Sequence, residues 1–320
     1  MHIHSRIRKA CFRWAAALLI TTALGACTTP IVGPQVRPIS ADLGARLNGP
    51  WSAVLGEDRP LKFMGEYRDN ASTHSYAMMY PAADLASFVA VIATHAAIQG
   101  AQTDARAAAL QDQANSILRP YQDILGELRV HDLFRESLIA HAPQARLVAA
   151  PDATAARPQI GLAAQVTMTQ DQRALVLDLV ATANDRATTD AQDAYIHKIR
   201  VVSDPVSSAH TDVQSYWRAD NGKALRASVK QILGQAIDLF VADATATLPH
   251  QDTVQITARY QLGGELATER ANLLIDTCER KTLRTLRGWV LSTPTAAPHQ
   301  HQGACMKDSE TPNAVARTGR

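Results

Sequence analysis

The sequence of 320 residues lacks the motifs by which several classes of enzyme are identified. It contains no Gly-x-Ser-x-Gly turn, which excludes a serine hydrolase of that type. Its glycine pair, Gly263-Gly264, is followed by Glu265 and Leu266 rather than by the lysine and hydroxyl residue of a nucleotide-binding P-loop. No two histidines are four positions apart, the spacing that places two metal ligands on one helix face. These absences favour a protein without a catalytic centre.

An excess of positive charge is also missing once the N-terminus is set aside. The sequence has 32 Lys and Arg and 30 Asp and Glu, but four of the basic residues and no acidic residue precede Cys27. A chain beginning at Cys27 therefore has 28 basic and 30 acidic residues, a net charge of about −2. Nucleic-acid-binding domains carry basic patches, so we expect no nucleic-acid partner.

The apolar run near the N-terminus is too short to cross a membrane. It extends over residues 14–24, whereas a spanning helix needs about 20 apolar residues. Four basic residues precede it: Arg6, Arg8, Lys9 and Arg13. A basic segment followed by a short apolar run is typical of a signal peptide. We therefore expect residues 1–26 to be a signal peptide.

The run ends in the segment Leu24-Gly25-Ala26-Cys27, where two small residues allow a peptidase to approach the backbone. This segment resembles the lipobox of bacterial lipoproteins. The resemblance implies cleavage before Cys27 and attachment of acyl chains, such as palmitate, to that cysteine. Two or more acyl chains hold a protein stably on a membrane. No aspartate follows Cys27 in the next two positions, so the resemblance implies the periplasmic face of the outer membrane as the location.

Composition divides the remainder of the chain into three parts. Residues 27–60 contain five prolines and show no sustained apolar period, so we expect a lipidated, extended tether. Residues 61–293 have the patterns of one α+β domain. Residues 294–320 are rich in His, Gln, Pro and Ala, and we expect a disordered tail.

Within the domain, apolar periodicity predicts both helices and strands. An Ala-rich helix is expected at about 84–118, another from Asp132 to near Pro143, and an amphipathic helix with one apolar stripe at about 221–246. Alternating apolar residues predict a hairpin over 160–168 and 175–181 with one buried face. Further strands are expected at 61–64, 75–80, 146–149, 195–203, 254–260, 271–278 and 282–292. The predicted fold is α+β: a mostly antiparallel sheet packed by the amphipathic helix.

Several motifs of the domain also resemble a family of uncharacterised proteobacterial lipoproteins. They are Tyr80-Pro81 beside an apolar helix, the long hairpin, the strand from Tyr195 to Ser203, the helix that begins near Trp217, and the closing pattern Arg284, Arg287, Gly288 and Trp289. The resemblance implies the same fold class and implies no activity.

Cys278 and Cys305 are the candidates for a disulfide, because Cys27 is expected to be acylated. A disulfide between them would close a loop of about 27 residues and contribute roughly 3 to 4 kcal/mol in the chain-entropy model. The alternatives are two free thiols, or a soft-metal site formed by Cys305 with His299 and His301.

Four basic residues lie within eight positions near the C-terminus: Arg280, Lys281, Arg284 and Arg287. They are candidates for contact with an anionic lipid or glycan. The alternative is a solvated strand edge whose charges prevent pairing with another sheet.

Taken together, the sequence predicts a lipid-anchored, non-enzymatic binding or assembly module of the envelope. It predicts a membrane contact through the acyl chains on Cys27, an envelope protein as partner, and no cofactor or metal. Two alternatives remain open at this point. One is a hydrolase of an envelope polymer, with carboxylates or histidines that the fold brings together. The other is a carrier of a small apolar ligand held between the amphipathic helix and the sheet.

Overall fold

The computed structural model describes residue 36 and residues 39–67, 101–152, 157–183, 195–249, 255–277 and 279–295. The helices in these ranges are α2 (Ala41–Leu47), α4 (Ala101–Asn115), the 3₁₀ helix η2 (Ser116–Tyr121), α5 (Gln122–Glu127), α6 (Val130–His141) and α7 (Val213–Ala244). The strands are β1 (Trp51–Val54), β2 (Lys62–Gly65), β3 (Ala145–Val148), β4 (Gln159–Met168), β5 (Leu175–Ala183), β6 (Tyr195–Val202), β7 (Gln255–Leu262), β8 (Glu265–Asp276), β9 (Arg280–Thr285) and β10 (Val290–Pro294).

The described strands form one ten-stranded sheet in the order β3-β1-β4-β5-β6-β10-β9-β8-β7, with β2 paired to β4. Five of these strand pairs are antiparallel and four are parallel. The predicted α+β fold with a mostly antiparallel sheet is therefore confirmed.

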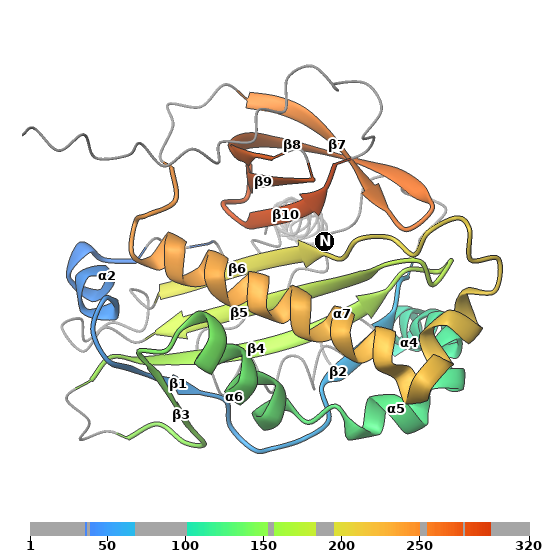
Figure 1. The fold of residues 1–320 in the computed structure, drawn as a ribbon, viewed down its shortest axis with the longest axis horizontal. Helices are drawn as coiled ribbons and strands as arrows, with labels where there is room; N and C mark the ends of the chain where they lie inside the picture. The colour runs from blue at the N-terminus through green and yellow to red at the C-terminus, as the bar shows by residue number, and fades with distance from the viewer. Residues whose placement is uncertain are drawn as a thin grey trace, which may run out of the picture.

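Strands β4, β5 and β6 form the centre of the sheet, and α7 lies diagonally across them with α6 beside it (Figure 1). One side chain in every two along β5 points at these helices, including the fully buried Leu175, Leu177 and Leu179. They pack in one core with the apolar stripe of α7, which includes Leu233 and Ile237. The predicted hairpin and the predicted stripe thus meet as expected. We call this side of the sheet the helix face.

Helix α7 is interrupted near its start, where the sequence analysis placed the beginning of the helix. Asp220, Asn221 and Gly222 all have positive φ values, of 50°, 56° and 75°. Left-handed backbone is favourable for glycine and tolerated by Asp and Asn. A short helical segment therefore precedes the break, and its Trp217 donates a hydrogen bond from Nε1 to the carbonyl of Gln172 at 2.6 Å. This bond joins the segment to the turn between β4 and β5.

The C-terminal strands curl over the opposite side of the sheet. Strand β10 pairs parallel to β6, and β9, β8 and β7 follow in antiparallel order. Tyr260 of β7 then forms an isolated bridge with Thr295, just after β10. A second apolar cluster, which contains Val202, Leu262 and Leu283, fills the space inside this curl.

Two predictions for the C-terminal strands were wrong. A single strand was expected at 282–292, but the chain turns between β9 and β10, where Gly288 has a φ of 82°. The amide of Gly288 donates a hydrogen bond to the carbonyl of Thr285, which closes the turn. The strand expected to begin at 271 begins at Glu265, because the turn at Gly263-Gly264 joins β7 and β8 directly.

The tether predicted for residues 27–60 is also wrong over its second half. Ser40 caps α2 by accepting a hydrogen bond from the amide of Leu43 at 3.2 Å. Strand β1 then pairs parallel to β3 and β4, and Trp51 at its start is almost fully buried. Burial of an indole ring is a large apolar gain. Residues 39–60 therefore belong to the folded domain, despite their prolines.

The long helix predicted at about 84–118 is confirmed as α4 over residues 101–115, after which the chain tightens into η2 at Ser116. Residues 84–100, the strand predicted at 75–80 and the tail from residue 296 lie outside the described residues. The strand predicted at 61–64 is β2, one residue later. Within the described ranges, no helix is both long and apolar enough to span a membrane.

Candidate functional site

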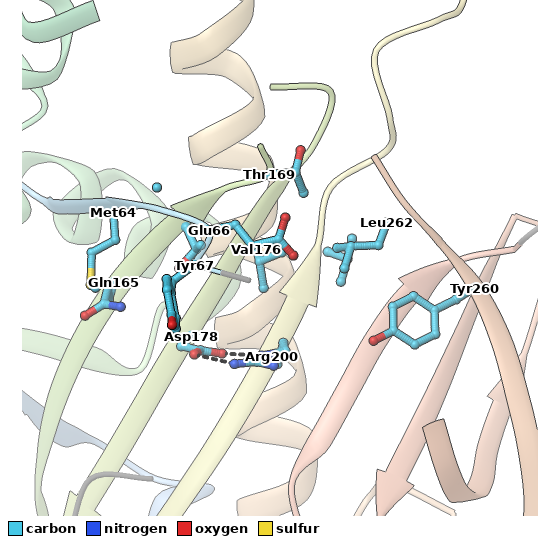
Figure 2. Close-up of a pocket in the computed structure, with 13 residues that line it drawn as sticks. Met64, Glu66, Tyr67, Gln165, Thr169, Val176, Asp178, Arg200, Tyr260 and Leu262 are labelled. Atoms are coloured by element: carbon cyan, nitrogen blue, oxygen red, sulfur yellow. Dashed lines mark hydrogen bonds and ion pairs between the residues drawn. The ribbon is translucent and has the colours of Figure 1, made fainter. Parts of the chain in front are cut away.

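A pocket of about 110 Å³ opens on the side of the sheet opposite α7 (Figure 2). Its wall is formed by the end of β2 with the two residues that follow, by β4, β5 and β6, and by β7 of the C-terminal curl. Alternation along the strands explains this position. Because Leu177 and Ile199 point into the core under α7, their neighbours Asp178 and Arg200 point to the other side. We call that side the far face.

The base of the pocket is a row of three polar side chains, one from each central strand. Gln165 of β4 is in register with Asp178 of β5, which is in register with Arg200 of β6. Arg200 donates two hydrogen bonds to the carboxylate of Asp178, from Nε to Oδ1 at 2.7 Å and from Nη2 to Oδ2 at 2.8 Å. Lys198 places its Nζ 2.9 Å from the same Oδ2. One carboxylate is thus shared by two cations.

These three charged groups lie largely out of water. Their side chains are 18% exposed for Asp178, 18% for Arg200 and 14% for Lys198. Burial by itself would raise the pKa of Asp178, but Arg200 and Lys198 more than offset it and hold that pKa far below its ordinary value. Burial lowers the pKa of Lys198 to about 8, although Asp178 opposes the shift. The site therefore keeps Asp178 and Arg200 ionised and leaves Lys198 with a proton that is easier to lose.

An aromatic ring extends this charge cluster along the far face. The Nζ of Lys198 lies 4.2 Å from the ring centroid of Trp289, and the guanidinium carbons of Arg200 and Arg287 each lie 5.6 Å from it. Cations at these distances are attracted to the electron-rich face of an indole ring. Glu269 of β8 faces the same group, and burial raises its pKa although Arg287 and Arg200 act in the other direction. The cluster therefore continues from the pocket to the C-terminal curl.

A second carboxylate lies at another part of the pocket wall. Glu66 follows β2 and is 6% exposed. Its Oε2 accepts a hydrogen bond from the amide of Gln170 at 3.3 Å. Figure 2 shows its carboxylate near Val176 and Leu262, separate from the Asp178–Arg200 pair. The pocket lining thus includes the carboxylate of Glu66, the Asp178–Arg200 pair, and apolar side chains such as Val176 and Leu262.

Helix α4 fixes the backbone that carries Glu66. The amide of Gly65 donates to Oδ1 of Asn115 at 2.9 Å, and its carbonyl accepts from Nε2 of Gln111 at 3.0 Å. A Cβ at residue 65 would overlap the carbonyl oxygen of Ala114. Only glycine permits this approach without displacement of the helix. The backbone next to Glu66 is therefore held in place by α4.

A different polar cluster lies on the helix face and joins α7 to the strands. His197 of β6 is 1% exposed and its Nε2 lies 3.0 Å from Oδ2 of Asp243. Arg284 of β9 donates to Oδ1 of the same carboxylate at 2.5 Å. Burial opposes ionisation of Asp243, but His197 and then Arg284 outweigh it and lower the pKa of Asp243 to about 2. This cluster is enclosed between α7 and the sheet and serves to hold them together.

The structure separates the four basic residues predicted as an anionic contact. Arg280 is paired with Asp204 at 2.9 Å, Lys281 with Asp276 at 3.6 Å and Arg284 with Asp243. Arg287 is exposed and lies over Trp289, beside the cluster of the far face. Of the four, Arg287 is the one that shares the ring of Trp289 with Lys198 and Arg200.

Other predicted site residues fall outside the described part of the chain. These are Leu24, Gly25, Ala26, Cys27, Cys278 and Cys305. Lipidation and the disulfide therefore stay predictions. In the described ranges, no group of three or more His, Cys, Asp or Glu side chains is arranged to hold a metal ion.

Sequence reasoning did not identify the pocket residues. A usable signal was present: an acidic residue on one strand and two basic residues at alternate positions of the next, all on one face. That signal predicts an ion pair only when the register of β5 with β6 is known, because Asp178 must lie opposite Arg200 for the pair to form. Comparison with known proteins adds nothing to these assignments, since no family model, curated protein or solved structure matches the chain.

Proposed function

We propose that this chain is a lipid-anchored, non-enzymatic binding module of the bacterial envelope, held at the periplasmic face of the outer membrane by acyl chains on Cys27. The lipobox-like segment Leu24-Gly25-Ala26-Cys27 supports the anchor. The pocket on the far face supports the binding role, and it is the observation that carries the proposal. Concave sites with mostly apolar walls and a few convergent polar groups are typical of ligand binding.

The chemistry of the pocket favours binding over hydrolysis. A hydrolase of an envelope polymer would need two carboxyl groups, one of them protonated and able to act as a general acid. Glu66 and Asp178 both line the pocket. However, the two oxygens of Asp178 accept bonds from Arg200 and Lys198, and its pKa is held low. A carboxylate held in this way positions cations and donates no proton.

The pocket also differs from the one expected for a carrier of a small apolar ligand. Such a ligand was expected between the amphipathic helix and the sheet. That layer is filled by Leu177, Leu233 and Ile237, all fully buried. The pocket lies on the other side of the sheet, and its lining includes the charged side chains of Glu66, Asp178 and Arg200. A ligand with polar groups is therefore the better match.

The anchor is tested by intact mass and membrane fractionation of the full chain expressed in a Gram-negative host. We expect the wild type to carry the mass of acyl chains and to sediment with the outer membrane. Cys27→Ser should lose both properties. Cys11→Ser is the matched control, because residue 11 lies in the segment expected to be removed, and it should behave as the wild type. A Cys27→Ser chain with unchanged mass and location would contradict the proposal.

The partner is tested by chemical crosslinking of the anchored wild type in the same membranes. We expect one dominant envelope protein to be captured. If the detergent-extracted protein elutes as a monomer, and no crosslinked species forms at any crosslinker concentration, the assembly role is contradicted while the anchor stands.

A further inference from the structure

The outer side of the β7–β8 hairpin carries two arginines without a counter-ion. Paired residues of the two strands point to the same side, and Thr257 is in register with Arg270 while Arg259 is in register with Thr268. Arg259 and Arg270 are therefore diagonal neighbours. Both are exposed, and neither has an ion pair within the described ranges. Because like charges in neighbouring cross-strand positions repel each other, an anion from outside the chain would stabilise them.

Two exposed leucines lie beside these arginines. Leu266 is 61% exposed and points to the same side as Arg270, since alternate residues of a strand share a side. Leu286 is 56% exposed and lies in the turn after β9. That turn is next to Arg270, because Thr285 is in register with Ala271. We call these four residues the curl patch: Arg259, Leu266, Arg270 and Leu286.

Acidic side chains are absent from this side of the hairpin over the described positions 257–270. The outer positions there are Thr257, Arg259, Gln261, Leu266, Thr268 and Arg270. Glu265 and Glu269 alternate with them and belong to the inner side, where Glu269 faces Arg287 and Arg200. Helix α7 crosses β4, β5 and β6 and leaves the hairpin uncovered (Figure 1). The curl patch is therefore basic and open. Basic residues combined with exposed leucines are typical of surfaces that bind membranes.

The segment that follows Cys27 enters the domain beside this patch. Gly288 lies in the turn between β9 and β10, and a Cβ at residue 288 would lie 3.1 Å from the Cβ of Val36. Val36 therefore packs against this turn, nine positions after Cys27. Nine residues span at most roughly 30 Å when fully extended. Acyl chains on Cys27 would thus keep the turn within that distance of the membrane surface.

This length limits which part of the domain can reach the membrane. A compact chain of about 250 residues has a radius of gyration of about 18 Å, and hence a diameter of about 45 Å. Helix α6 lies at the opposite end of the sheet from the curl (Figure 1). An anchor of roughly 30 Å that starts at the curl is too short to bring α6 against the membrane. The curl patch lies within its reach.

We propose that the curl patch docks on the membrane surface, with its two arginines at the phosphates of anionic phospholipids and its two leucines at the boundary with the acyl chains. Arginine forms bidentate hydrogen bonds with phosphate, and basic residues are attracted to anionic membrane surfaces. The inference rests on the proposed function in one respect, that acyl chains on Cys27 hold the chain at the membrane. It adds a single orientation, in which the α6 end of the sheet points away from the membrane.

The orientation is tested with the purified full chain reconstituted into vesicles of phosphatidylethanolamine and phosphatidylglycerol. The vesicles contain a spin-labelled phospholipid, which quenches fluorescence at short range. A fluorescent amino acid replaces Thr268 within the patch or, as the matched control, Ile139 on α6, which is 70% exposed. We expect loss of fluorescence at position 268 and no loss at position 139. Equal quenching at the two positions, or stronger quenching at position 139, would overturn the proposal.

The role of charge is tested by Arg259→Gln combined with Arg270→Gln. The ratio of quenched to unquenched fluorescence at position 268 should fall about tenfold, and a similar fall is expected for the wild type in vesicles of phosphatidylcholine. Arg135→Gln with Arg218→Gln is the matched control, because it removes the same charge from exposed positions on α6 and α7. It should be quenched as the wild type is. Full quenching of the Arg259 and Arg270 variant, or of the wild type in phosphatidylcholine, would overturn the assignment.

Flotation of the same vesicles separates this proposal from the anchor. An acylated chain that floats with both kinds of vesicle but is not quenched at position 268 overturns the docking and leaves the anchor standing. A chain without acyl mass that floats only with phosphatidylglycerol vesicles rejects the anchor and supports the docking. A chain without acyl mass that floats with neither kind contradicts both.

Discussion

The two sides of strand β5 have different chemistry, although their residues alternate along the same nine positions. On the helix face, Leu175, Leu177 and Leu179 are fully buried against the stripe of α7. On the far face, Val176 and Asp178 line a pocket, and Asp178 holds two cations. The first side gains free energy from burial of apolar surface. The second side gives up part of that gain by removal of charges from water.

This difference is informative about function. A buried ion pair contributes little net stability, because its desolvation offsets most of its attraction, and apolar replacements are often as stable. A sheet face that only needed a cover would therefore be served by apolar residues, as the helix face is. Charges at the far face are better explained by a ligand that uses them. We accordingly expect changes on the helix face to affect stability and changes on the far face to affect binding, except where they leave one buried charge alone.

The largest effect is expected for a change that leaves a buried charge without its partner. Asp178→Leu leaves Arg200 and Lys198 buried without their shared carboxylate. Loss of one partner of a buried pair costs about 3 to 5 kcal/mol, and urea unfolding followed by circular dichroism should show it. Asp178→Leu combined with Arg200→Leu should recover part of the loss. A single variant as stable as the wild type would show that the pair is better solvated than its exposure indicates.

The next prediction compares the loss of stability on substitution of two adjacent residues that lie on opposite faces of the sheet. Leu179 is fully buried under the helices, and Leu179→Ala should lower the free energy of unfolding by about 3 kcal/mol. Val180 lies on the far face and is partly exposed, so Val180→Ala should lower it by about 1 kcal/mol. Urea midpoints measured side by side decide the matter. Equal losses would remove the distinction between the two faces.

A third effect appears as a change of stability with pH. The pKa of Asp243 falls from an ordinary 3.8 to about 2 in the folded chain. A group whose pKa is lowered by folding adds stability above its unfolded pKa and loses it as the pH falls through its folded pKa. Asp243 should thus contribute about 2 kcal/mol above pH 4 that disappears towards pH 2.

Asp243→Asn tests this contribution directly. The variant should be less stable than the wild type at pH 7 and should lose less stability between pH 4 and pH 2, as measured by urea midpoints at each pH. Parallel curves for the two proteins over that interval would show that Asp243 is not the group responsible. Lys198 has a pKa of about 8 and does not titrate in this interval. A change of stability between pH 4 and pH 2 therefore reports on Asp243 of the helix face and not on Lys198 of the far face.

Sequence patterns predicted the central elements because their signals are local. Alternation over 160–168 and 175–181 gave the hairpin, and the apolar stripe gave most of α7. The errors occurred where one residue interrupts a longer pattern. Gly288 divides the strand predicted at 282–292 into β9 and β10, and the sequence Asp220-Asn221-Gly222 divides α7. Both places contain glycine at positive φ, which was the available signal.

The site was less predictable than the fold because it depends on contacts between distant segments. Arg200 meets Asp178 only through the register of β5 with β6, and Glu66 reaches the same pocket only because β2 pairs with β4. Tyr260 comes to the pocket from the C-terminal curl. No pattern within one segment contains this information.

The most direct test of the account places a photo-crosslinking amino acid at one position on each face of the full chain in intact bacterial cells. Gln165 lies at the base of the pocket, and Ile139 is 70% exposed on α6. We expect one dominant adduct with an envelope component from position 165, background labelling from position 139, and loss of the adduct when Cys27 is changed to Ser. Equal adducts from the two positions, or an adduct from position 139 alone, would contradict the assignment of the far face as the binding face.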